Sequence, residues 1–214
     1  MVESVARTEH GDSSSQAWLP VIAHPLSHSD PHQNHLLAAL PASEWQRWAP
    51  QLDWVELEAG RVLSEAGSTP LYAYFPSTAV VSLLYLTQDG ASAEFAVVGR
   101  DGVVGISLLM GGDTSPGSAV VQGAGLACRV RAQFLREEMR HGGASLVLLL
   151  RYVQAMLTQV VQSAACNRYH SIEQQLARRL LMGLDRSTGQ ELRMTQELLA
   201  SLLGVRREGV TAAA

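Results

Sequence analysis

The chain has 214 residues, a net charge of −4 and 47% hydrophobic residues, a composition typical of a globular protein with one or two domains. Residues 1–165 carry 9 Arg and 15 acidic residues, whereas residues 166–214 carry 7 Arg and 5 acidic residues. The C-terminal part is therefore mildly basic, which permits contact with nucleic acid without demonstrating it.

The two cysteines and the hydropathy of the chain indicate which kinds of protein can be excluded. Cys128 and Cys166 have no CxxC or Cys/His ligand spacing, so reduced thiols are expected in place of a disulfide framework, an iron–sulfur cluster or a zinc site. The N-terminus lacks the apolar region of a signal peptide, and we expect no membrane-spanning helix. The sequence predicts a cytoplasmic protein with no metal and no membrane partner.

The first part of the chain has little periodicity. Residues 1–33 mix Ser, His, Asp and Pro, which is typical of a flexible leader. Asn34 is predicted to cap a short helix, and a second helix carrying Trp45 and Trp48 should end at Pro50.

The middle of the chain has the pattern of a β domain. Short β-type runs alternate with glycine turns, and Asp89-Gly90 gives the strongest hairpin signal. The predicted strands are 54–57, 61–64, 71–75, 79–86, 92–98, 118–122 and 127–130. Strands this short and this closely spaced indicate an antiparallel sandwich or barrel. A helix is predicted over 134–140. Together with the two helices before the strands, it gives a predicted domain over 34–143.

A long helix is predicted over 144–165, with apolar residues at the alternating four and three spacing of a heptad seam. The seam residues are Leu146, Leu150, Val153, Leu157, Val160 and Ala164. The alternative is one amphipathic helix laid on its own domain, because Leu148, Leu149, Met156 and Val161 widen the apolar surface. Periodicity alone leaves both interpretations open.

Residues 166–214 have the pattern of a small helical unit. After a helix through Leu176 and Leu180, Thr195 is a suitable N-cap for another. The apolar and glycine positions that follow have helix-turn-helix spacing, namely Leu199, Ala200, Leu203, Gly204, Val205, Val210 and Ala213. The alternative is a plain helical hairpin with a solvated Arg pair at 206–207.

The arrangement from about residue 34 to 214 resembles the Crp/Fnr family of bacterial transcription regulators. The similarity lies in 58–63, 65–67, 74–76, 80–83, 98–105 and 195–211. It implies an α+β fold: an antiparallel, jelly-roll-like β-roll of the cyclic-nucleotide-binding type (34–143), a dimerisation helix (144–165) and a partial winged helix-turn-helix (166–214). The resemblance also implies a homodimer that regulates transcription at palindromic DNA, with RNA polymerase as a further partner. It favours the interpretation of the helix over 144–165 as a dimer seam.

The resemblance implies a set of DNA-contacting residues, which are Thr195, Gln196, Arg206, Arg207, Glu208 and Thr211. Arg207 and Glu208 match the family's base-reading pair, suited to guanine and to the cytosine amino group. Thr195 and Gln196 match positions that hold the DNA backbone. A further base-contacting Arg of the family is Ala212 here. Because the sequence stops at Ala214, before a wing, we expect this polypeptide to bind DNA weakly or not at all.

The effector pocket implied by the resemblance lacks its charged residues. Ile106 follows Gly105 where nucleotide-binding members have Glu, and Gly117 stands before Ser118 and Ala119 where they have Arg. Each charged hydrogen bond is worth about 1.5 to 3 kcal/mol, so cyclic AMP is disfavoured and no cofactor is expected. Three outcomes are expected: the pocket is empty, it holds an apolar and unknown small-molecule effector, or it has lost sensing.

Catalysis is not expected, because no nucleophile with a base, no metal cluster and no facing carboxylates are present. Glu137 and Glu138 are adjacent, about 100° apart on a helix, and are expected to be solvated. The alternative to a DNA-binding regulator is a dimeric ligand-sensing or interaction module that does not bind DNA. A native stop after Ala214 would favour that alternative.

Overall fold

The structure is a computed structural model that describes residues 30–87, 92–186 and 194–213. Most of the predicted leader and the Asp89-Gly90 turn lie outside the described residues. The end of the leader is not irregular, since it forms the 3-10 helix η2 (Pro31–Gln33). The Asp30 side chain caps η2 by accepting a hydrogen bond from the His32 backbone N–H.

Asn34 caps helix α1 (His35–Ala38) as predicted. Its Oδ1 accepts from the backbone N–H groups of Leu36 and Leu37 at 3.0 and 3.2 Å. Its Nδ2 donates to the carbonyls of Pro76 and Gly102, both at 2.9 Å. Because the fully buried amide uses both ends, it also fixes α1 to the β domain. Helix α2 (Ala42–Trp48) and the 3-10 turn η3 (Ala49–Gln51) follow.

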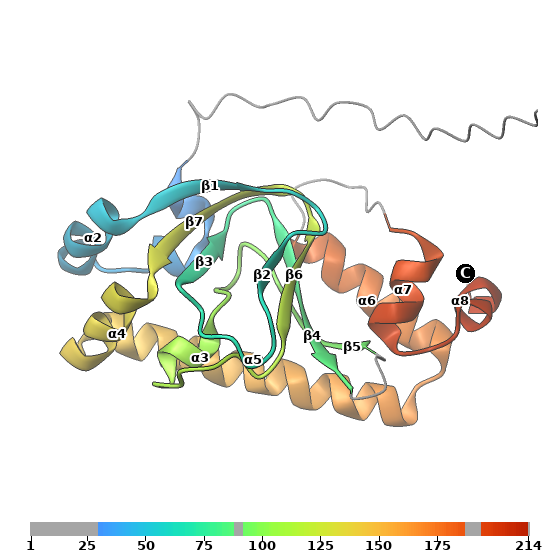
Figure 1. Cartoon of the computed structure of the whole chain (residues 1–214). Helices are drawn as coiled ribbons and strands as arrows, with labels where there is room; N and C mark the ends of the chain where they lie inside the picture. The colour runs from blue at the N-terminus through green and yellow to red at the C-terminus, as the bar shows by residue number, and fades with distance from the viewer. Residues whose placement is uncertain (1–29, 88–91, 187–193, 214) are drawn as a thin grey trace, which may run out of the picture.

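All seven predicted strands are present and pair only with antiparallel neighbours. They are β1 (Asp53–Leu57), β2 (Val62–Ser64), β3 (Tyr72–Pro76), β4 (Val80–Leu86), β5 (Ser92–Val98), β6 (Ser118–Gly123) and β7 (Gly125–Arg131). They form one sheet in the order β1-β7-β3 and another in the order β2-β6-β4-β5. We call these two sheets the β-roll (Figure 1). The fold is therefore α+β with an antiparallel roll, as the sequence predicted.

Among the strands, the largest boundary difference is at β7, which is predicted over 127–130. Gly125 lies outside the predicted strand, but it begins β7 and pairs with Leu57. A Cβ at Gly125 would lie 2.5 Å from Thr78 Oγ1 and 2.6 Å from the Ala79 nitrogen. Glycine is needed here because the backbone at 78–79 lies too close for a side chain. The tendency of glycine to form turns does not predict this position within a strand.

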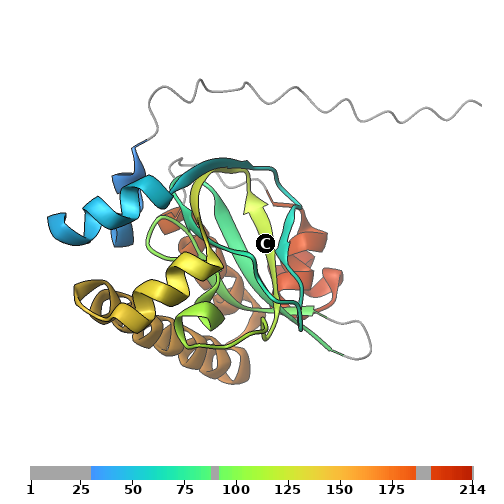
Figure 2. The ribbon, with the colours of Figure 1, turned by 60° about the vertical axis from the view of Figure 1, so that its left-hand side comes forward.

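Six helices complete the described part of the fold after β5. They are α3 (Ile106–Leu109), α4 (Ala132–His141), α5 (Ala144–Tyr169), α6 (Ile172–Arg186), α7 (Gln196–Leu203) and α8 (Arg207–Ala213). Helix α5 continues past the predicted end at residue 165. It runs beneath the β-roll, and we call α6 to α8, which lie together at one end, the C-terminal helices (Figures 1 and 2).

Two apolar clusters hold the β-roll and α5 together. One contains Trp48, Phe75, Leu108 and Leu149, and so joins the N-terminal helices, β3, α3 and α5. The other lies within the roll, where side chains from both sheets meet Met156 of α5. Helix α5 therefore belongs to both cores through a single face.

A buried polar cluster joins α2, α4 and α5, and it corrects one expectation. Glu138 is buried, not solvated, and accepts from the Trp48 indole at 3.1 Å and from Arg47 at 3.2 and 3.0 Å. Glu44 accepts from Arg47 at 3.0 Å and from the Ser145 hydroxyl and backbone N–H at the start of α5. Neighbouring helices supply these donors, which helix periodicity alone does not reveal.

Candidate effector pocket and DNA-binding surface

Gly105 and Ile106 form the turn into α3. Gly105 has φ 108°, a left-handed conformation that favours glycine, and serves as the N-cap of α3. Ile106 follows at the first helical position and packs against both apolar clusters. The position at which the resemblance implies a Glu is therefore used here for apolar packing.

Gly117, at the other implied pocket position, is packed against the backbone of β4. A Cβ at Gly117 would lie 2.5 Å from the Leu84 carbonyl oxygen and 3.1 Å from the Phe95 ring, so no side chain fits without displacing β4. The Ser118 hydroxyl accepts from the Ala66 backbone N–H at 3.3 Å, and Ala119 is part of the apolar cluster of the roll. None of the three residues has a charged side chain.

Helix α5 presents different faces to the roll and to solvent. Leu149, Val153 and Met156 are buried, and Val160 packs against the roll. Leu150 and Leu157 are 47% and 53% exposed. The predicted seam is thus divided: Leu150, Leu157 and Ala164 face outward, whereas Val153 packs inward at 8% exposed and Val160 is half-buried.

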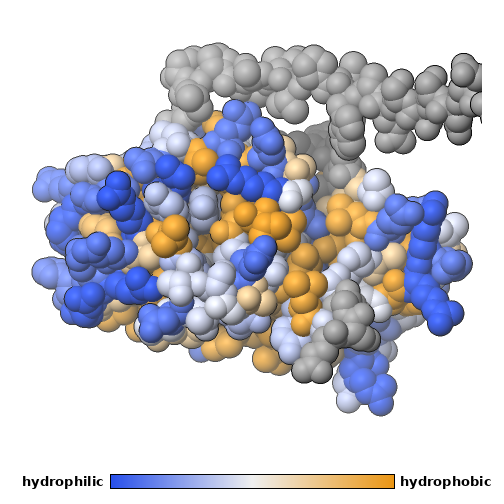
Figure 3. Space-filling view, in the orientation of Figure 1, coloured by the Kyte–Doolittle hydropathy of each residue, from blue (hydrophilic) through white to orange (hydrophobic). Residues whose placement is uncertain are grey.

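The outward apolar residues of α5 have a heptad spacing of their own. We call Val147, Leu150, Leu157 and Val161 the outer stripe, and all are exposed. With Gln154, also exposed, they recur every three and four residues. The outer stripe keeps two of the six predicted seam residues, Leu150 and Leu157. In place of the half-buried or buried Leu146, Val153 and Val160 it has the residues one position later, which are Val147, Gln154 and Val161. Apolar surface follows the lower edge of the molecule, where α5 runs (Figure 3).

By length and composition α5 would also pass for a membrane-spanning helix, since an 18-residue window reaches a mean hydropathy of 1.5. That differs from the expectation of no such helix. The same helix supplies buried side chains to both apolar clusters of the β-roll. Its hydropathy reflects two apolar faces, one against the roll and one outward.

The residues predicted to pack between the last two helices do so. Leu199, Ala200 and Val210 are buried together with Leu176 of α6, and Leu203, Val205 and Ala213 pack against them. Gly204 caps α7 at φ 65°, and the Val205 N–H donates to the Ala200 carbonyl at 3.0 Å. The left-handed glycine therefore makes the sharp turn between α7 and α8.

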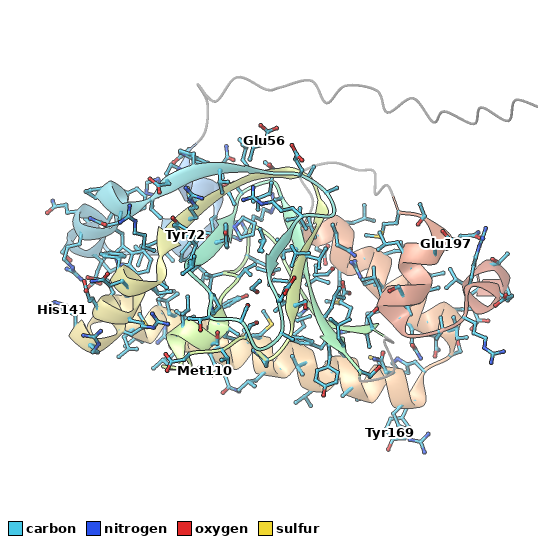
Figure 4. The ribbon with its side chains drawn as sticks, in the orientation of Figure 1. Glu56, Tyr72, Met110, His141, Tyr169 and Glu197 are labelled. Carbon is cyan, nitrogen blue, oxygen red and sulfur yellow. The ribbon has the colours of Figure 1, made fainter. Side chains whose placement is uncertain are left out.

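Every predicted DNA-contacting residue is exposed, and none belongs to a core cluster; they are Thr195, Gln196, Arg206, Arg207, Glu208 and Thr211. Thr195 accepts from the Leu198 N–H at 3.1 Å as the N-cap of α7. Arg207 forms an ion pair with Glu197 at 3.1 Å, and Thr211 donates to Gln196 at 3.0 Å. No sequence pattern singled out Glu197 as the partner of Arg207. Glu197 lies at the end of the molecule opposite His141 (Figure 4).

Charged residues also join the C-terminal helices to the β-roll. Arg179 Nε lies 2.5 Å from Glu94 Oε1, and both side chains are almost fully buried. Arg186 pairs with Asp101 at 3.0 Å and donates to the Val97 carbonyl at 3.1 Å. Burial raises the pKa of Glu94, while Arg179 opposes that shift.

These junction residues were not singled out from sequence, although one signal was available. Arg179 lies three positions after Leu176 and four before Gly183, and all three are buried. An arginine on the inward face of an amphipathic helix requires an acceptor. Its partner Glu94 is 85 positions away and has no local signal. Among the described residues, no group of three His, Cys, Asp or Glu side chains could hold a metal ion.

One protein-family model matches part of the chain. Residues 54–141 match the family model of the cyclic nucleotide-binding domain. No curated protein matches the sequence.

Solved structures extend the likeness beyond the β-roll. A Crp/Fnr-family transcriptional regulator from Eubacterium rectale has a TM-score of 0.67 at 14% identity, covering 85% of each chain. FixK2 from Bradyrhizobium japonicum has a TM-score of 0.66 at 17% identity, covering 76% of this chain and 82% of that one. CLP, a c-di-GMP-responsive global regulator from Xanthomonas campestris, has a TM-score of 0.64 at 16% identity, covering 81% and 89%. The chain therefore has the fold of Crp/Fnr regulators, and residues 54–141 are similar to the cyclic nucleotide-binding domain.

Proposed function

We propose that the protein is a DNA-binding transcription regulator of the Crp/Fnr type. The proposal rests on the two sides of α8. One side packs against α7 in a buried apolar contact. At the start of α8, Arg206, Arg207 and Glu208 are exposed and belong to no core cluster. Such a helix end suits base edges and phosphates in a major groove. The comparisons do not favour the alternative of a module that does not bind DNA.

The proposed active form is a homodimer in which the outer stripe of one α5 meets that of a second copy. Four exposed apolar side chains at heptad spacing suit a coiled-coil partner, and Gln154 among them would help to set register. Two copies of α8 would then be related by a two-fold axis, which fits a palindromic site with half-sites about one helical turn apart. Cytoplasmic location and contact with RNA polymerase remain predictions.

For the effector, the proposal keeps cyclic AMP disfavoured and names no cofactor. It is supported by the apolar Ile106 and by the backbone packed against Gly117. We do not expect an enzyme, in line with regulatory neighbours in the structural comparison.

The test has two steps. DNA duplexes that the protein prefers are first selected from a pool of random sequences. Binding of the protein to a selected duplex is then titrated at low salt, where phosphate contacts are strongest. We expect Arg207→Ala to lose about 1 to 3 kcal/mol on the selected site and to relax the preference for one base pair. Arg140→Ala, an exposed residue of α4, is the matched control. Equal affinity and equal site preference in wild type and Arg207→Ala would remove α8 as the base-contacting helix.

A further inference from the structure

We propose that Glu197 is a positioning residue for Arg207, the predicted base-reading arginine, and that it sharpens the choice of base at the position that Arg207 meets. Glu197 lies in the first turn of α7, and Arg207 begins α8. The inference rests on the proposed function and deepens it, because it concerns which groups make the DNA-binding surface selective. Figure 4 shows Glu197 at the surface of the C-terminal helices.

The backbones that carry the two side chains are held in place by buried packing. Leu199 of α7 is buried together with Val210 of α8. A second polar contact joins the same two helices, since the Thr211 hydroxyl donates to Gln196 Oε1 at 3.0 Å. The two positions are therefore fixed relative to each other, and a contact between them has to order only side chains.

The ion pair occupies one end of the guanidinium and leaves the rest of it available. Arg207 Nη1 lies 3.1 Å from Glu197 Oε1. Within the described part of the chain, Nε and Nη2 of Arg207 have no hydrogen-bond partner, and the side chain is 61% exposed. Two N–H groups of one guanidinium can donate together to O6 and N7 of guanine. A guanidinium anchored through Nη1 keeps Nε and Nη2 as such a pair of donors.

The ion pair between Glu197 and Arg207 contributes little to the stability of the free protein, because both side chains are exposed to water. Its effect arises on DNA. Holding a long side chain in its binding geometry reduces the entropy lost on binding, and exclusion of water by the DNA strengthens the pair. A base that accepts both free N–H groups therefore gains more over one that does not. The carboxylate also places a negative charge near the DNA phosphates, so it weakens binding to DNA of every sequence.

The first measurement is made without DNA. NMR relaxation of the Arg207 Nε–H group in the full chain should show a restricted side chain in wild type and a more mobile one in Glu197→Gln. Glu137→Gln, the same substitution at an exposed residue of α4, is the matched control and should leave Arg207 as it is in wild type. Equal mobility of Arg207 in wild type and Glu197→Gln would overturn the proposal.

The second measurement compares the selected duplex with one in which the base pair whose preference Arg207→Ala relaxes is exchanged. Glu197→Gln should reduce this discrimination about three- to tenfold, while its affinity for a duplex of unrelated sequence should rise. In the Arg207→Ala background the same substitution should leave discrimination unchanged, which a general loss of structure would not do. An equal change in both backgrounds would mean that Glu197 contacts the base itself and does not position Arg207.

The outcomes separate this inference from the proposed function. A wild-type chain that binds no duplex would remove the proposed function and the role of Glu197 with it. Binding with a base preference that Glu197→Gln does not alter would leave the proposed function in place and refute only the inference.

Discussion

Gly117 stands where the resemblance implies an arginine for the cyclic phosphate, and its surroundings leave no room for a side chain. Its Cα faces the Leu84 carbonyl, and any side chain would enter the space of β4. An arginine at this position would therefore have to displace the Leu84 carbonyl before its side chain could reach an anion.

We expect Gly117→Arg to lower the free energy of unfolding by about 1 to 3 kcal/mol, as for other overpacked positions, and to leave cyclic AMP binding undetectable. Chemical denaturation and calorimetry measure the two effects. Thr114→Arg, an exposed residue of the same loop, is the control and should have little effect. A stable Gly117→Arg protein that binds cyclic AMP would show that β4 moves easily.

Glu44 links stability to pH. The hydrogen bond from the Ser145 hydroxyl, aided by the charge of Arg47, holds the pKa of Glu44 below its usual range. A lowered folded-state pKa means that the ionised carboxylate contributes stability above its usual pKa of about 4.3. This contribution is lost as the pH falls through the folded-state pKa.

The free energy of unfolding of wild type should therefore fall more steeply than that of Glu44→Gln as the pH is lowered from about 5 to 3. Urea denaturation across this range measures the difference. Glu58→Gln, an exposed residue, should follow wild type. Parallel curves for wild type and Glu44→Gln would mean that Glu44 does not carry this linkage.

At the scale of elements, α5 combines the two interpretations that its periodicity left open. It is a core helix of its own domain through Leu149, Val153 and Met156, and it is apolar on the opposite side as well. Substitutions on the two faces should therefore have different consequences. An inward charge would unfold the domain, whereas an outward charge would act only on association.

We expect Leu150→Asp combined with Leu157→Asp to convert a dimer to a monomer that keeps its secondary structure, because both charges would lie unpaired in the seam. Sedimentation velocity and circular dichroism measure the two properties. Gln162→Asp, exposed on α5 but off the outer stripe, should leave the dimer intact. An unaltered dimer in the double variant would show that the outer stripe is not the interface.

At the scale of the whole molecule, the C-terminal helices cover β5, the edge strand of its sheet. Arg186 is central to this contact, since a Cβ on Gly99 would lie 2.6 Å from Arg186 Cβ. The pairing of Arg186 with Asp101 and with the Val97 carbonyl fixes the end of α6 on the roll. The C-terminal helices thereby protect the edge strand β5 from pairing with another chain.

Arg186→Ala should increase amide hydrogen exchange of α6 to α8 several-fold while leaving the strands unchanged, because the local contact is lost and the roll core is not. Mass spectrometry of exchanged peptides measures this. Arg140→Ala, on the exposed side of α4, is the control. Unchanged exchange in α6 would show that apolar contacts alone hold the junction.

The sequence by itself determined the strands, the long helix and the spacing of the last two helices. These are local patterns, and Asn34, Gly204 and the apolar alternation act within a few residues.

Only the tertiary structure decided which side of α5 faces outward, whether Gly117 has room for a side chain, and that Arg179 meets Glu94. Each depends on residues far apart in the chain, as with the 85 positions between Glu94 and Arg179. Periodicity gives the faces of an element, but the packing of other elements determines which face is covered.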